Sequence, residues 1–368
     1  MNQTDKLSVK QAIMWFSMYQ IGSTFLVLPR ILTQSAQQDG WISGFIAIVM
    51  QLLLTPLYMV LIRQFKGKTF SEYLEMTLGK WGGKIVLFIF TIMYPFFIFM
   101  VVLRNMTDYI TTSVMVETPA EALAIMMLIA VISIVRSGVS VIGRCAEIIF
   151  FVMILINLVN IFSFMADAHF EFLLPMVENG IGPIFKGAYS MFSNPFLENI
   201  LFLFLLGNMT NPKQWSKVVI SSSLISGLIF TSVTFFSISL LGAGVVARLT
   251  YPTYFIVRTI SVADFFERYE IVVSMLFYLT IFFRMSLLLY ITAKNFTSIF
   301  GLKDYRSLLV PLALISITLQ KDIWPNTVES SQILGTAPII HGNLFGLILP
   351  CILCVIGAFR GKKKQSKH

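Results

Sequence analysis

The chain has 368 residues, of which 57% are hydrophobic and only 12% are charged, and its formal net charge is +9. Soluble globular proteins are about half apolar and about a quarter charged. With 34 Phe and 19 Met, the chain carries more apolar surface than a soluble fold of this length could bury. The composition excludes a cytosolic enzyme, a nucleic-acid-binding protein and a secreted disulfide-linked module, and it predicts a polytopic membrane protein.

The charge distribution and the cysteines indicate no other class of protein. The basic residues are scattered between apolar runs, so the positive charge does not indicate a nucleic-acid partner. Cys145, Cys351 and Cys354 lie in or beside apolar runs and support no disulfide framework. The N-terminus is short and polar, and the first apolar run has no cleavage-type end, so no cleavable signal peptide is expected.

Apolar runs of the length that crosses a bilayer, about 20 residues, follow one another along the chain. In order, the ten predicted spans are 10–33, 41–63, 84–112, 119–136, 141–166, 185–209, 215–243, 270–299, 306–320 and 337–359. The ninth is short, whereas the third and the eighth are long enough to tilt or to emerge from the membrane. We therefore predict one all-α membrane domain over residues 1–368.

The lysines and arginines predict the orientation. With the N-terminus inside, inner segments hold 19 of the 27 and outer segments hold 7. Because positive residues favour the cytoplasmic side, both termini are expected to be cytoplasmic. The sizeable extramembrane pieces are 64–83, 167–184 and 244–269, and none could fold alone, so we expect no enzyme. The amphipathic segment 244–269 is predicted to form a helix over the outer face.

Two spans contain helix-breaking residues near their middle. Gly22, in Gln20-Ile-Gly-Ser-Thr, is the weakest helix former of the first span. In the sixth span, Pro195 follows Asn194 and cannot donate the helical hydrogen bond. Backbone freed inside a membrane must line a cavity or be met by protein groups. Either break alone fits a simple kink, but the two together favour a substrate site.

The two breaks fall in corresponding helices. Ten spans divide into halves of five, 8–166 and 185–360, and the second half would enter the membrane from the opposite side. Similarity between the halves would make them an inverted repeat, which is common in secondary transporters.

Ionisable residues inside a membrane are costly and usually functional. Glu198 lies one turn after Asn194, and Arg284 lies midway along the eighth span; structural pairing and a ligand or gating role are equally open for both. Glu147 and Arg144, one turn apart, are expected to form an interfacial structural pair. No metal site, phosphate-binding loop or nucleophile elbow is found, so no cofactor or metal is expected. His169 and His341 lie apart from each other, in or near outer loops.

Several short motifs resemble those of the spore germination permeases, the B subunits of nutrient germinant receptors in the amino acid–polyamine–organocation superfamily. They occur in the family's order across 8–360 and are Gln20-Ile21-Gly22-Ser23 with Leu28-Pro29, Gln38 to Ser43, Gly79 to Lys84, Arg144 to Phe150, Tyr251-Pro252-Thr253, Phe265 to Arg268, and Arg284-Met285-Ser286 to Tyr290. The resemblance implies a leucine-transporter-like fold with broken helices 1 and 6. It also implies the spore inner membrane and a complex with a larger A subunit and a lipoprotein C subunit.

The same resemblance implies a pocket for an amino acid or similar nutrient between helices 1, 3, 6 and 8. Carried over by motif, its contacts are Ile21, Gly22 and Ser23; Asn194, Pro195 and Phe196; and Ser286 and Tyr290, with Val101 added as a guess from the third helix. Helix N-terminal N–H groups near Gly22 would bind the carboxylate, and carbonyls near Asn194 and Pro195 would accept the ammonium.

Three functions remain open. The chain is expected to sense a nutrient and to signal to its partner subunits. Alternatively it is an amino-acid permease that moves its ligand, or a subunit that conducts ions or water or serves as a scaffold. Its environment is membrane lipid in each case.

Overall fold

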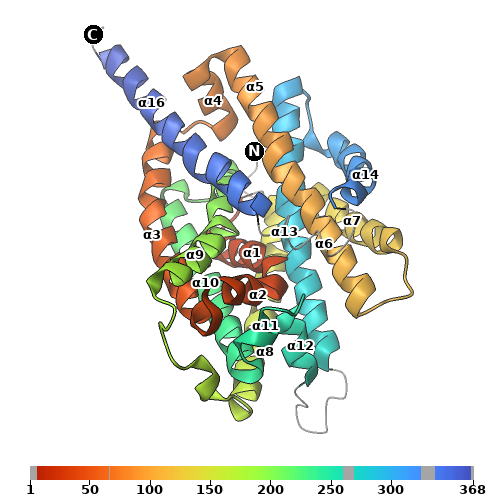
Figure 1. The fold of residues 1–368 in the computed structure, drawn as a ribbon. Helices are drawn as coiled ribbons and strands as arrows, with labels where there is room; N and C mark the ends of the chain where they lie inside the picture. Colours follow the sequence, from red (N-terminus) through yellow and green to blue (C-terminus); the bar gives the residue numbers. More distant parts are fainter. Residues whose placement is uncertain (1–5, 66, 260–268, 325–335, 366–368) are drawn as a thin grey trace.

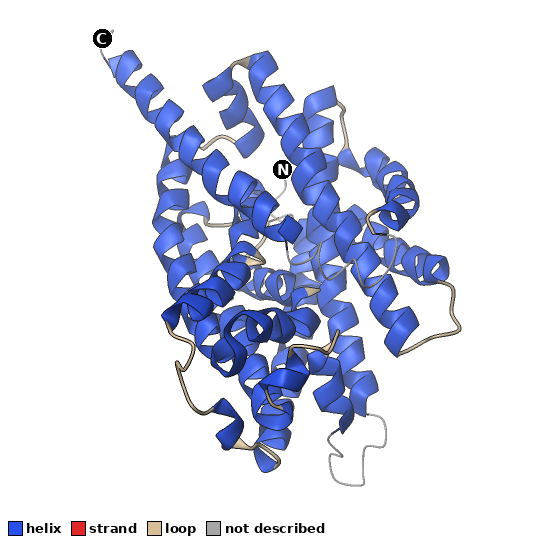
Figure 2. Cartoon of the chain, viewed as in Figure 1, coloured by secondary structure: helices blue, strands red, loops and turns tan. Residues whose placement is uncertain are grey.

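The computed structural model describes residues 6–65, 67–259, 269–324 and 336–365, and it folds them almost entirely into helices (Figure 2). Within these residues the extended pairing is one isolated parallel bridge between Leu7 and Met209. The predicted all-α class is therefore confirmed.

The helices follow one another in two series (Figure 1). The first consists of α1 (Val9–Ile21), α2 (Thr24–Ala36), α3 (Gly40–Phe65), α4 (Phe70–Leu78), α5 (Lys80–Thr91), a π-helical turn η3 (Ile92–Phe96), α6 (Phe97–Ser113), α7 (Ala120–Ser137) and α8 (Val139–Ala166). The second consists of α9 (Ile181–Ser193), the 3₁₀ segment η5 (Phe196–Asn208), α10 (Trp215–Leu241), α11 (Ala243–Val246), α12 (Pro252–Thr259), α13 (Tyr269–Phe300), α14 (Leu309–Leu319), a helix over 336–341 that continues as the π-helical η9 (Gly342–Ile348), and α16 (Leu349–Gln365).

Eight of the helical stretches among the described residues are long and apolar enough to cross a membrane. They are Thr24–Phe65, Lys80–Ser113, Ala120–Ser137, Val139–Ala166, Ile181–Asn208, Pro212–Leu241, Ile271–Phe300 and Thr336–Phe359. These agree within a few residues with the predicted second to eighth and tenth spans, although the stretch that begins at Thr24 also includes α2.

The other two predicted spans do not reach that length. The first is divided at Gly22 and Ser23 into α1 and α2, each of 13 residues, which at 1.5 Å per residue is about 20 Å. The ninth is represented by α14, which has 11 residues. Ten spans therefore remain a prediction, while both predicted breaks are present: α9 ends at Ser193, and η5 begins at Phe196.

Helix α1 lies at the centre of the molecule. All of its residues from Met14 to Ile21 are buried, and it packs on α8, α10 and α13. A Ser8 capping box begins it: Ser8 Oγ accepts from the Gln11 amide at 3.2 Å, and the Gln11 side chain accepts from the Ser8 amide at 3.1 Å. The capping box satisfies two backbone N–H groups at the start of α1, ahead of the part of the helix that is continuously buried.

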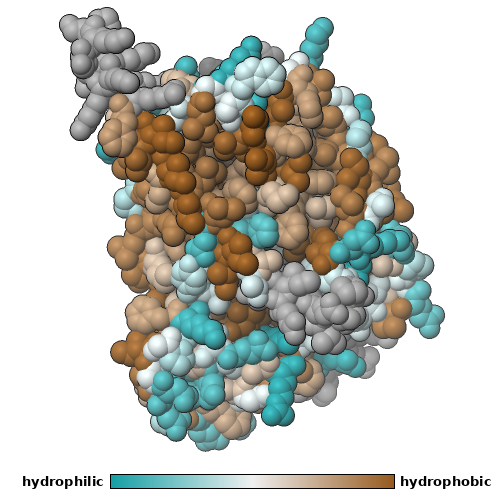
Figure 3. All heavy atoms as spheres, turned by 45° about the horizontal axis from the view of Figure 1, so that its top comes forward, coloured by the Kyte–Doolittle hydropathy of each residue, from teal (hydrophilic) through white to brown (hydrophobic). Residues whose placement is uncertain are grey.

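The outer helices present apolar side chains to their surroundings. On α8, Ile148 and Phe162 are 70% and 72% exposed. Hydrophobic side chains cover much of the face seen in Figure 3, and hydrophilic ones gather toward its lower edge. A monomer in water rarely exposes so large an apolar patch, so this surface fits lipid.

The segment 244–269, predicted as one helix, is interrupted within its described part. The described part contains α11 and α12, separated by residues 247–251, and residues 260–268 lie outside the described residues. The Thr253 hydroxyl of α12 donates to the Phe25 carbonyl of α2 at 2.9 Å, so this segment is held against the second half of the first broken helix.

Close glycine contacts hold α3, α9 and α10 together. A methyl group on Gly44 would overlap the side chain of Thr231, and one on Gly227 would overlap Ile48. Gly187 likewise faces Ser43, whose hydroxyl donates to the Ile184 carbonyl at 2.9 Å. Small residues that allow backbones to approach are a common means of packing membrane helices.

Gly44→Val should lower the thermal unfolding midpoint of the detergent-purified protein, because overpacking costs about 1–3 kcal/mol and the obstructing Thr231 is held by its own helix. Gly182→Val is the matched control, since a methyl group there meets no atom within 4 Å. Equal midpoints for the two variants would contradict the packing interpretation.

Candidate functional site

The two helix breaks meet around a buried ion pair. Arg284 of α13 places Nη2 2.7 Å and 2.9 Å from the two carboxylate oxygens of Glu198, in the first turn of η5. The two side chains are only 2% and 5% exposed. A charge buried without its partner would be strongly unfavourable, so each of these groups requires the other.

Helix α1 completes this cluster. The Tyr19 hydroxyl donates to Glu198 Oε2 at 2.5 Å, and the Arg284 guanidinium lies 5.0 Å from the centre of the Tyr19 ring. Arg284 Nη1 also donates to the Tyr19 carbonyl at 3.4 Å and to Thr24 Oγ1 at 3.3 Å. The carbonyl freed at the first break therefore receives a protein donor, as an interrupted membrane helix requires.

Gly22 has a steric function at this point. A methyl group on it would lie 2.6 Å from Arg284 Cδ and 3.0 Å from the Tyr19 carbonyl oxygen. The glycine thus allows the arginine stem to pass directly over the break. Gly22 is the C-cap of α1 and packs against the Arg284 side chain. It does not line the cavity that lies beside the ion pair.

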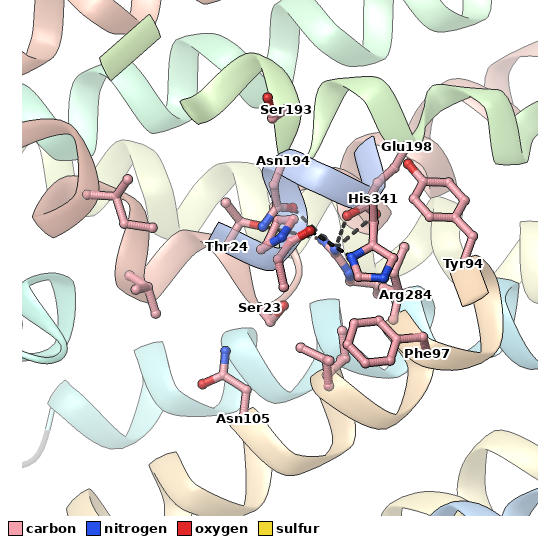
Figure 4. A pocket seen from close by; sticks show the side chains of 17 residues that line it. Ser23, Thr24, Tyr94, Phe97, Asn105, Ser193, Asn194, Glu198, Arg284 and His341 are labelled. Atoms are coloured by element: carbon pink, nitrogen blue, oxygen red, sulfur yellow. Dashed lines mark hydrogen bonds and ion pairs between the residues drawn. The ribbon is translucent and has the colours of Figure 1, made fainter. Parts of the chain in front are cut away.

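A cavity of about 60 Å³ lies beside the ion pair (Figure 4). One water molecule needs roughly 10–15 Å³ by this measure, so the space holds several waters or a small solute. Its walls come from α2, η3 and α6, the α9–η5 break, α13 and the helix over 336–341. The described lining residues are Ser23, Thr24, Val27, Ile31, Tyr94, Phe97, Ile98, Val101, Val102, Asn105, Ser193, Asn194, Glu198, Arg284, Ala337, Pro338 and His341.

Several polar atoms of this lining are buried and unsatisfied. Ser193 Oγ, Tyr94 Oη and Arg284 Nε have no hydrogen-bond partner among the described residues. Buried polar atoms normally find a partner, so these three groups retain unused hydrogen-bonding capacity, as do buried groups elsewhere among the described residues such as Gln51 and Trp215. Most of the remaining wall is apolar, which is typical of small-molecule sites.

A neutral network lies next to the ion pair and joins three helices. Gln20 of α1 donates to Asn199 Oδ1 of η5 at 2.6 Å and to Ser223 Oγ of α10 at 3.1 Å. Ser226 of α10 donates to Gln20 Oε1 at 2.6 Å. Both broken helices are therefore tied to α10 by side chains that are fully buried.

The predicted ligand contacts are only partly brought together. Ser23, Val101 and Asn194 line the cavity with Glu198 and Arg284, and Arg284 Nη2 lies 3.5 Å from Asn194 Oδ1. The other predicted contacts do not line it among the described residues: Ile21, Gly22, Pro195, Phe196, Ser286 and Tyr290. Pro195 is the N-cap of η5 and Phe196 is its first residue, so both lie at the break of the sixth span but outside the cavity lining.

Ser286 and Tyr290 have other partners. Ser286 donates to the Phe282 carbonyl of its own helix at 2.6 Å. Tyr290 lies two turns beyond Arg284 along α13; its hydroxyl donates to Asn208 at 3.1 Å and accepts from Lys294 at 2.9 Å. The family resemblance, not helical periodicity, suggested these two residues as contacts, and neither lines this cavity among the described residues.

Glu147 is not paired as expected. Its carboxylate accepts from Lys10 at 2.8 Å and from Gln11 at 3.4 Å, so its salt bridge joins α8 to α1 and is not the predicted one with Arg144. Lys10 is 61% exposed and Glu147 is 32% exposed, so this pair contributes little to stability. Glu147 is remote from the cavity lining and is not a buried charge.

Sequence reasoning missed several polar groups of the site, including Thr24, Asn105 and Ser193 of the cavity lining. Tyr19 holds Glu198, while Tyr94 and His341 line the cavity. Tyr19 immediately precedes the Gln20-Ile-Gly-Ser motif, which was a usable signal. Tyr94 stands next to Pro95 in a predicted span, and a proline at that position was a second signal.

Known proteins resemble this chain along almost its whole length. A family model described as spore germination protein matches residues 6–328. The chain is a member of this family. It is 26% identical over 366 residues to spore germination protein KB of Bacillus subtilis (strain 168). The matched region covers 98% of this chain and 96% of that protein.

Two further relatives from the same organism match over nearly their whole length. Spore germination protein B2 is 25% identical over 345 residues, and spore germination protein A2 is 26% identical over 366 residues. These matches cover 90% and 96% of this chain, respectively. The chain is accordingly an integral membrane protein of the germination permease family, as its motifs and its apolar helices indicated.

Glu198→Gln should destabilise the protein by about 3–5 kcal/mol, the cost of leaving one buried charge unpaired. The double variant Glu198→Leu with Arg284→Met should recover most of this loss, because no charge remains buried. Thermal unfolding of the purified proteins in detergent measures both. A single variant as stable as the unchanged protein, or a double variant less stable than the single one, would contradict the interpretation.

Proposed function

We propose that this chain is the nutrient-sensing subunit of a spore germinant receptor, with its binding site in the cavity beside Arg284 and Glu198. The observation that carries the proposal is the group of unsatisfied buried atoms, Ser193 Oγ, Tyr94 Oη and Arg284 Nε, in a cavity at the junction of two broken helices. A packing defect would be apolar, whereas these atoms need hydrogen-bond partners.

The charges in the proposed site suit a small zwitterion such as an amino acid. Arg284 and Glu198 neutralise each other, so the site carries no net charge from this pair. Helix α2 starts at Thr24 without a side-chain cap from Ser23, and both residues line the cavity. The N-terminus of a helix favours an anion, so the carboxylate of the nutrient is expected there.

Binding would act by stabilising one arrangement of the two breaks. A ligand shifts a conformational equilibrium only by its difference in affinity for the two states. A solute that contacts Ser23 on one broken helix and Asn194 on the other would bind the closed arrangement better. The receptor would then transmit this change to its partner subunits.

The wider setting of the proposal comes from the family resemblance. We place the chain in the spore inner membrane with both termini on the cytoplasmic side, in a complex with an A subunit and a lipoprotein C subunit. The fold would be a single membrane domain of ten helices in two inverted halves, 8–166 and 185–360. The two breaks at Gly22 and Asn194 support the inverted arrangement because they fall in the first helix of each half.

Ser23→Leu should raise the nutrient concentration that gives half-maximal germination by at least tenfold, because leucine would occupy the carboxylate end of the cavity. Ser286→Ala is the control: Ser286 is also buried, but it bonds within its own helix and does not line the cavity. Spores that carry each variant, with receptor level checked by immunoblot, are compared across a panel of nutrients. An unchanged midpoint for Ser23→Leu in an assembled receptor would overturn the proposed site.

A further inference from the structure

His341 contributes to the cavity a side chain that the sequence placed near an outer loop. The helix over 336–341 provides Ala337, Pro338 and His341 to the lining. The imidazole ring stacks on Phe97 of α6, with 4.7 Å between ring centres and an angle of 17° between the planes. Figure 4 shows His341 next to Phe97 and Arg284. Stacking holds the ring in one orientation within the site.

The proton on this ring is placed by the backbone. His341 Nδ1 lies 2.7 Å from the Ala337 carbonyl oxygen. A carbonyl oxygen only accepts, so Nδ1 carries the hydrogen, and in a neutral imidazole Nε2 then presents a lone pair. The hydrogen bond that His341 makes among the described residues uses Nδ1, so Nε2 remains available as an acceptor.

Two other acceptors around the cavity, Glu198 and Asn194, already face a cation. Glu198 accepts from Arg284 with both oxygens and from Tyr19 with Oε2. Asn194 Oδ1 faces Arg284 Nη2 at 3.5 Å. An amine that entered the cavity would compete with the guanidinium at either of these residues, whereas no cation among the described residues contacts His341 Nε2.

We propose that His341 is a ligand-recognition residue whose Nε2 accepts a hydrogen bond from the amine of the nutrient. The inference rests on the proposed function and adds to it the residue that binds the ammonium group and the direction in which the solute lies, with its amine toward the helix over 336–341. The carboxylate would then lie toward the start of α2.

His341→Phe and His341→Gln separate this function from packing. Phenylalanine keeps a flat ring against Phe97 but has no acceptor, and glutamine keeps an acceptor without the ring. His169→Phe is the control, because His169 lies in the loop between α8 and α9 and its side chain is 60% exposed. The probes are L-alanine, L-valine and L-asparagine, each applied alone to spores in which this chain belongs to the sole nutrient receptor.

In assembled receptors, His341→Phe should raise the half-maximal concentration of the active amino acid by at least about tenfold, which corresponds to 1.4 kcal/mol. His341→Gln should retain most of the response, and His169→Phe should match the unchanged protein. An unshifted midpoint for His341→Phe, or equal losses for phenylalanine and glutamine, would overturn the assignment. A receptor that responds only to solutes without an amine would overturn it as well.

The outcomes distinguish this inference from the proposed function. If Ser23→Leu shifts the midpoint and His341→Phe does not, the cavity binds nutrient without His341. If neither variant shifts it, the site itself is wrong. Should His341→Phe fail to accumulate, the purified His341→Gln protein provides a second measurement: its thermal midpoint should still rise with the active amino acid, and absence of that rise would contradict the inference.

Discussion

The ion pair between Arg284 and Glu198 is the constraint on which the centre of this protein depends. Inside a membrane protein neither charge is tolerated alone, and the 2.7 Å contact brings α13 and η5 together at that depth. The Tyr19 hydroxyl of α1 donates a further hydrogen bond to the Glu198 carboxylate. The passage of the arginine stem over the first break requires that residue 22 have no side chain. One charge pair thus accounts for the residue types at four positions on three helices.

The broken helices serve this arrangement because they supply polar groups where intact helices would supply none. The backbone carbonyl of Tyr19, at the end of α1, accepts from Arg284, and the side-chain oxygen of Asn194, the residue at the second break, accepts from the same guanidinium. Gln20 and Asn199 connect the same two breaks to α10. The cavity lies beside this network, and its lining includes Ser193 Oγ and Tyr94 Oη, which have no hydrogen-bond partner among the described residues.

The sequence was informative where local chemistry decides the structure. Glycine and proline break helices through their own backbone properties, so both interruptions were located within a residue or two. Partners across the fold were harder to predict, because they depend on how helices pack. Glu147 is one turn from Arg144, yet it pairs with Lys10, 137 residues away. His341 looked isolated because the stretch that carries it reaches the cavity only through tertiary packing. Ser286 and Tyr290 stay predictions as ligand contacts, since they lie on α13 outside the cavity lining.

Electroneutrality of the cavity has a consequence for how the protein responds to the membrane potential. Moving one elementary charge through a potential of 100 mV changes its energy by about 2.3 kcal/mol. A zwitterion that bound beside the mutually neutralising Arg284 and Glu198, as we propose, would add no net charge at that depth because its own two charges cancel. Its occupancy would then be insensitive to voltage, whereas a cationic or anionic solute would be drawn in or expelled as the potential changes. A receptor that bound its nutrient in this way would read chemical composition independently of the electrical state of its membrane.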